Sequence, residues 1–88
     1  MRTIEFAEAA SRQLLKPDRP VARRIVRFLR ERASEAPDPR ALGAALKGDE
    51  LGRFWKYRVG DYRVIAEIRD SEIRIVVIRL GRRSDVYR

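Results

Sequence analysis

The sequence predicts an α+β fold in which two N-terminal helices pack on one face of a small, mainly antiparallel sheet. Three features lead to this prediction: an alternating segment at the N-terminus, an amphipathic helical pattern over residues 18–33, and three successive strand-like segments after residue 53. The expected element order is β-α-α-β-β-β. The chain has 88 residues and neither a repeat nor a linker, so we expect a single domain over residues 1–88.

The first strand and the first helix are short. Residues 2–6 alternate, with Ile4 and Phe6 on one side, which is typical of a strand. Residues 7–15 are rich in alanine and predict a helix that ends before Pro17.

The second helix is predicted to run about four turns from an N-cap at Asp18. Its apolar residues recur with helical spacing and its opposite side is rich in arginine. The apolar set is Val21, Ile25, Phe28, Leu29 and Ala33, and the polar set is Arg23, Arg24, Arg27, Arg30 and Glu31. We interpret these arginines as a solvated helix face. The segment 37–39 breaks the helix, and residues 38–52 are expected to form an irregular connector with one helical turn.

Three strands are predicted in the second half. Residues 54–59 alternate, Gly60 and Asp61 form a tight turn, and residues 62–68 form the next strand. After a turn at 69–72, residues 73–80 are mostly apolar and β-branched, which favours a central strand that ends at Gly81.

The net charge and the composition favour some classes of partner and exclude some classes of chemistry. Lys and Arg number 21 against 13 Asp and Glu, a net charge of +8, which favours a polyanion or an acidic protein as partner. The sequence has no Cys and no His, so imidazole catalysis and thiolate or imidazole metal sites are excluded, and we expect no metal and no cofactor. No apolar run is long enough to span a membrane and no signal segment is evident, so we expect a cytoplasmic protein without a membrane partner.

A basic cluster is predicted at one end of the sheet. Lys56 and Arg58 are two residues apart and therefore face the same side of their strand. Arg63 lies just across the turn, and the last strand is expected to bring Arg83 and Tyr87 to the same end. Four adjacent cations repel one another unless an anion such as a phosphodiester lies between them.

Two interpretations of this cluster remain open on the residues alone. One is a basic strand surface that binds nothing in particular or binds nucleic acid without chemistry. The other is attack by an RNA 2′-OH on its own phosphate, which needs alignment, charge stabilisation and modest proton transfer but no metal. In the second case Lys56 is the cation most readily deprotonated, because arginine stays charged.

Two segments resemble the RelE/ParE toxin superfamily. Residues 55–65 (WKYRVGDYRVI) are similar to its central signature, and residues 81–88 (GRRSDVYR) to its closing motif; residues 46–52 fit as well. The resemblance implies a toxin of a type II toxin–antitoxin pair. In the RelE branch such a toxin enters the ribosomal A site and cuts mRNA by 2′-OH attack, without a metal.

The resemblance also implies roles for individual residues. Lys56, with Arg58 beside it, matches the positions of the base and of phosphate contacts. Arg63 matches the arginine that stabilises the transition state, Arg83 the arginine at the leaving 5′ oxygen, and Tyr87 the tyrosine that stacks on the substrate. Further RNA contacts are expected from Lys47, Arg53 and Arg82.

Alternatives and partners follow from the same resemblance. A ParE-like toxin would inhibit DNA gyrase without catalysis, and a degenerate toxin would only bind its antitoxin as a corepressor. The expected partners are a cognate antitoxin, the ribosome with its mRNA, and operator DNA reached through the antitoxin. The combined presence of the five catalytic candidates favours the ribosome-dependent endoribonuclease.

Overall fold

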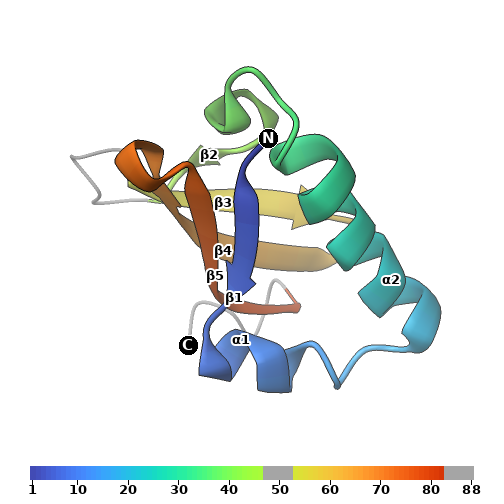
Figure 1. The fold of residues 1–88 in the computed structure, drawn as a ribbon. Helices are drawn as coiled ribbons and strands as arrows, with labels where there is room; N and C mark the ends of the chain where they lie inside the picture. The colour runs from blue at the N-terminus through green and yellow to red at the C-terminus, as the bar shows by residue number, and fades with distance from the viewer. Residues whose placement is uncertain (47–52, 83–88) are drawn as a thin grey trace.

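The computed structural model describes residues 1–46 and 53–82. Its elements confirm the predicted α+β class with two helices ahead of a strand meander (Figure 1). They are β1 Thr3–Phe6, α1 Glu8–Gln13, α2 Arg19–Arg27, the π-helix η1 Phe28–Ala33, the 3-10 helix η2 Pro39–Leu42, β2 Ala44–Ala45, β3 Phe54–Val59, β4 Tyr62–Arg69, the 3-10 helix η3 Asp70–Glu72, and β5 Arg74–Arg82.

The strands form one five-stranded sheet in the order β1-β5-β4-β3-β2. Only the β1–β5 pair is parallel, so the sheet is mainly antiparallel, as predicted. Both helices lie on one side of it (Figure 1). Ala10 of α1 and Ile25 of α2 are fully buried in one cluster with Tyr57, Val64 and other residues of the same sheet face.

A β-bulge between β4 and β5 sets which side chains of β5 reach this core. Val77 and Leu80 are both buried there, although residues three apart face opposite sides of a regular strand. The register shifts between Ile65 and Ala66, whose partners are Arg79 and Val77, and the extra residue on β5 restores Leu80 to the core face. The bulge also turns Arg79 to the face away from the helices.

The structure differs from the prediction in one strand boundary, in the type of one helical segment and in one additional strand. Gly81 does not end the last strand, since it pairs with Arg63 and β5 continues to Arg82. The second helix is not uniformly α-helical: its last six residues form a π-helix, in which Ser34 N–H donates to the Leu29 carbonyl at 2.9 Å. The connector contains the expected helical turn, η2, but also the short strand β2, which was not predicted.

Aromatic side chains of β3 hold this connector in place. The Tyr57 hydroxyl donates to the Pro39 carbonyl at 2.8 Å, and Trp55 Nε1 donates to the Arg40 carbonyl at 2.9 Å. The Arg40 guanidinium in turn donates two hydrogen bonds of 3.1 Å to the Asp70 carboxylate. These contacts lower the pKa of Asp70, chiefly through the hydrogen bond from Arg40.

The N-terminal helix secures the far end of β5. Strand β1 pairs with β5 only from Arg74 to Val77. Beyond that point the Leu80 N–H donates to Oε1 of Gln13 on α1 at 2.7 Å. A side chain of the helix thus satisfies a strand N–H that β1 does not reach.

Replacing Gly43 with alanine is expected to destabilise the fold by about 1–3 kcal/mol, because overpacking forces the backbone to shift. A Cβ on Gly43 would lie 2.3 Å from the Lys56 carbonyl oxygen and 2.8 Å from the Tyr57 ring. Chemical denaturation measures the loss. Ala41→Ser, at an exposed neighbouring position, is the matched control; equal stability of G43A and wild type would contradict the close approach.

Candidate nucleic-acid interface

The face of the sheet turned away from the helices carries the predicted basic residues. Side chains directly opposite one another in a sheet share a face, so the register places them. Lys56 pairs with Ile65, Ile65 pairs with Arg79, and Arg58 pairs with Arg63. We call Lys56, Arg58, Arg63 and Arg79 the basic face. The expected grouping of Lys56, Arg58 and Arg63 is therefore present.

Arg58 and Arg63 form a cross-strand pair on either side of the β3–β4 turn. Cβ atoms of directly opposed residues lie about 4.5–5.5 Å apart, and like charges there are destabilising. Within residues 1–46 and 53–82, no carboxylate forms a salt bridge with either arginine. The pair is therefore well suited to hold an anion between the two guanidinium groups.

The opposite end of the same face is electrically balanced. Arg69 and Arg74 lie close to carboxylates there: Arg69 pairs with Glu67 and Glu72, and Arg74 with Glu5 and Glu72. The hydrogen bond from Arg69 to Glu67 raises the pKa of Arg69. On this face, Arg58 and Arg63 near the β3–β4 turn thus differ from Arg69 and Arg74, since neither forms a salt bridge with a carboxylate of the described residues.

Arg79 was missed as a candidate from the sequence. Regular alternation along residues 74–80 would place it with Ile75 and Val77, which are core residues. The bulge shifts the alternation of β5 by one residue. Arg79 therefore lies on the same face as Lys56, with Ile65 between them. The nearly continuous apolar run of this strand gave no signal of the bulge.

A second basic groove adjoins Arg58 at the edge of β3. Its volume is about 230 Å³, and the charged residues that line it are Arg24, Arg27, Glu31, Arg32 and Arg58. Its apolar wall includes Phe28, whose ring meets Tyr57 edge-on at 5.4 Å and carries the Arg32 guanidinium at 5.4 Å. Arg24 and Arg27 are exposed, as expected for a solvated helix face, and they extend the positive surface away from Arg58.

The remaining predicted contacts lie elsewhere. Arg53 is exposed just before β3, with its guanidinium 5.7 Å from the centre of the Phe54 ring. Arg82 pairs with Tyr62 on the helix side of the sheet, so it is separated from the basic face. Lys47, Arg83 and Tyr87 lie outside the described residues.

The described residues contain no cluster of three or more Asp, Glu, His or Cys side chains that would hold a metal ion. In the same part of the chain, no helix is long and apolar enough to cross a membrane.

The fold and the basic face define a small α+β protein whose sheet carries arginine and lysine on the face away from the helices. Comparison with known proteins gives the family. Residues 4–87 match the family described as the ParE toxin of type II toxin–antitoxin systems, and the chain belongs to this family. It is a type II toxin of the RelE/ParE superfamily.

Similar proteins of known sequence or structure agree with this assignment. The chain is 30% identical over 86 residues to Toxin RelG of Mycobacterium tuberculosis, covering 98% of this chain and 95% of that protein. It superimposes with a TM-score of 0.75 on the toxin–antitoxin complex RelBE2 of M. tuberculosis, at 27% identity over 96% of this chain and 93% of that one. The isolated Escherichia coli RelE toxin gives a TM-score of 0.76 at 25% identity, over 99% and 92% of the two chains. The predicted RelE-like fold is confirmed.

Proposed function

We propose that this toxin is a ribosome-dependent endoribonuclease that cleaves mRNA in the A site and thereby inhibits translation. The observation that carries the proposal is the opposed pair Arg58 and Arg63, with Lys56 on the same face. Two guanidinium groups held opposite each other cost stability unless they bind an anion, and the scissile phosphate of RNA is an anion of suitable size. The similarity to RelE and RelG toxins supports this class of activity.

The proposed reaction transfers no group to the protein. The 2′-OH attacks its adjacent phosphorus, the P–O5′ bond breaks, and the products are a 2′,3′-cyclic phosphate and a 5′-OH. Lys56 takes the 2′-OH proton, and Arg58 and Arg63 stabilise the charge that develops on the phosphoryl oxygens. Arg83 contacts the leaving 5′ oxygen, which takes its proton from water, and Tyr87 stacks on the substrate nucleotide; these two roles rest on the sequence motif.

The remaining expected RNA contacts extend this site. Lys47 and Arg53 bind flanking phosphates, and Arg82 contacts RNA from the helix side of the sheet. Such contacts position a strand without reading its sequence. The whole chain, residues 1–88, is proposed to act as one domain in the cytoplasm without a metal or another cofactor.

The second candidate is a ParE-like toxin that inhibits DNA gyrase. The observation that favours it is the family match itself, which is to the ParE toxins over residues 4–87. In that case the basic face would bind its target without cleavage.

The partner common to both candidates is a cognate antitoxin. The similar structures include toxin–antitoxin complexes, such as RelBE2 of M. tuberculosis and RelE–RelB of Pyrococcus horikoshii. A net charge of +8 suits an acidic partner, and charge complementarity accelerates association. Operator DNA would be reached through that antitoxin.

Primer extension on a reporter mRNA tests the proposal, with purified protein in a reconstituted translation system and, separately, without ribosomes. We expect cuts within the A-site codon that appear only when ribosomes are present. A gyrase supercoiling assay runs in parallel. Absence of cuts together with inhibited supercoiling would replace the endoribonuclease by the gyrase toxin.

A further inference from the structure

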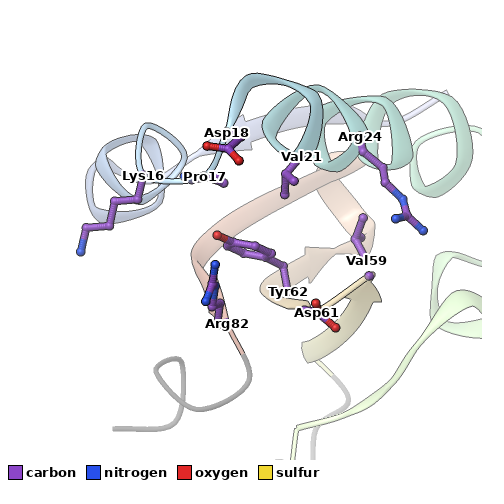
Figure 2. Close-up of a pocket in the computed structure, with 10 residues that line it drawn as sticks. Lys16, Pro17, Asp18, Val21, Arg24, Val59, Asp61, Tyr62 and Arg82 are labelled. Carbon is purple, nitrogen blue, oxygen red and sulfur yellow. The ribbon is translucent and has the colours of Figure 1, made fainter.

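A hollow on the helix side of the sheet lies at the β3–β4 turn, away from the basic face. Its volume is about 440 Å³, within the range of roughly 300–1,000 Å³ that is typical of small-molecule sites. Val21 of α2, Val59 of β3 and the half-buried ring of Tyr62 form its apolar walls. Figure 2 shows the Tyr62 ring between Val21 and the side chain of Arg82.

Charged groups of both signs border this apolar surface. Arg82 lies beside Tyr62, its cross-strand partner, and Arg24 lines the pocket from α2 on the far side of Val59 (Figure 2). Asp18 and Asp61 also line it. The pocket therefore combines cationic and anionic side chains around an apolar surface.

Gly60 of the β3–β4 turn lies beside the Arg24 guanidinium at this pocket. The residue has φ +59°, in the left-handed region that favours glycine. A Cβ at Gly60 would lie 3.2 Å from Nη1 of Arg24, so the turn leaves room for a guanidinium beside it. Arg24 lines both this pocket and the groove that contains Arg58.

The combination of an aromatic ring, carboxylates and arginines selects among anionic ligands. Asp18 and Asp61 would repel a bare phosphate, which also has no apolar surface to place against Val21, Val59 and Tyr62. A nucleoside phosphate matches all three features: its base packs on an aromatic ring, its ribose hydroxyls and base N–H groups donate to carboxylates, and its phosphate accepts from arginine.

We propose that the pocket formed by Val21, Arg24, Val59, Tyr62 and Arg82 is a nucleotide-binding site. Tyr62 contacts the base, Asp18 and Asp61 accept hydrogen bonds from the nucleoside, and Arg24, on the far side of Val59 from Tyr62, binds the phosphate. The ligand is either a free nucleotide or one nucleotide of a single RNA strand. Binding there requires neither the ribosome nor the proposed cleavage, so it is tested on the isolated full chain.

The test is an NMR titration at low salt with guanosine 5′-monophosphate, inorganic phosphate and guanosine as separate probes. We expect the amides of Gly60, Asp61 and Tyr62 to shift with the nucleotide and its affinity to exceed that of either fragment. Arg24→Gln should weaken nucleotide binding about tenfold or more, because it removes a charge-assisted hydrogen bond. Arg23→Gln is the matched control, since it removes the same charge from the adjacent exposed position outside the pocket.

Three results would overturn the site: no shifts at the β3–β4 turn of the wild-type protein, phosphate binding as tight as nucleotide binding, or equal losses in R23Q and R24Q. The wild-type shift map does not depend on whether any variant folds. A short single-stranded RNA then distinguishes the sources. Competition with the nucleotide identifies an RNA strand as the ligand, and failure to compete identifies the free nucleotide.

Discussion

Replacing Arg63 with alanine is expected to reduce mRNA cleavage by about two to three orders of magnitude, the usual effect of removing one donor to a developing oxyanion. Arg63 lies opposite Arg58, where a phosphate between the two would accept hydrogen bonds from both. Its described protein contact is weak: Nη1 lies 3.5 Å from the Tyr62 carbonyl oxygen. Little folding stability therefore depends on it, and the melting temperature should stay within a few degrees of wild type.

Single-turnover cleavage on programmed ribosomes measures this effect. Arg23→Ala removes an exposed arginine of α2 and controls for net charge. Arg63→Lys should retain only part of the rate, because lysine keeps the charge but loses the planar fork that binds two phosphate oxygens. Cleavage by R63A at the wild-type rate, or an equal loss in R23A, would remove Arg63 from the site.

Alkaline pH is expected to destabilise the fold through Tyr57. This side chain is fully buried, and burial raises its pKa to about 12. Unfolding restores a pKa of about 10, so the folded state binds the phenolic proton more tightly. The stability that this provides is fully present below pH 10 and is lost as pH rises toward 12, by about 2 kcal/mol at pH 11.5.

Denaturant unfolding at pH 7 and pH 11.5 tests this prediction with Tyr57→Phe. At pH 7 the variant should be less stable by about 0.5–1.5 kcal/mol, since it loses the hydrogen bond to the Pro39 carbonyl. Between the two pH values it should lose about 2 kcal/mol less than wild type. Tyr62→Phe, at the half-buried neighbour in β4, is the control. The same alkaline loss in Y57F as in wild type would show that another group is responsible.

The β3–β4 hairpin was predictable because its signals are local. A turn at Gly60 and Asp61 separates two alternating segments, and β3 pairs with β4 without a bulge from Phe54 to Val59. Strict period-two alternation then places Lys56 and Arg58 on one face.

The parts that were not predicted depend on contacts between distant residues. The bulge opposite Ile65 and Ala66 is a property of pairing, and it alone sets Arg79 on the basic face. Strand β2 holds only Ala44 and Ala45, and the connector before it is positioned by hydrogen bonds from Trp55 and Tyr57. No local pattern of residues 38–46 reports those partners.

Identifying the nucleophile that cleaves the mRNA is the most direct test of the proposed function. Ribosomes are programmed with an mRNA whose A-site codon carries a single 2′-deoxy substitution at the nucleotide 5′ of the scissile phosphate, and cleavage is compared with the all-ribose mRNA. The mechanism requires that 2′-OH as nucleophile, so we expect cleavage of the ribose mRNA to a 2′,3′-cyclic phosphate and no cleavage at the substituted position. Cleavage of both mRNAs at the same phosphate would contradict the mechanism assigned to the basic face.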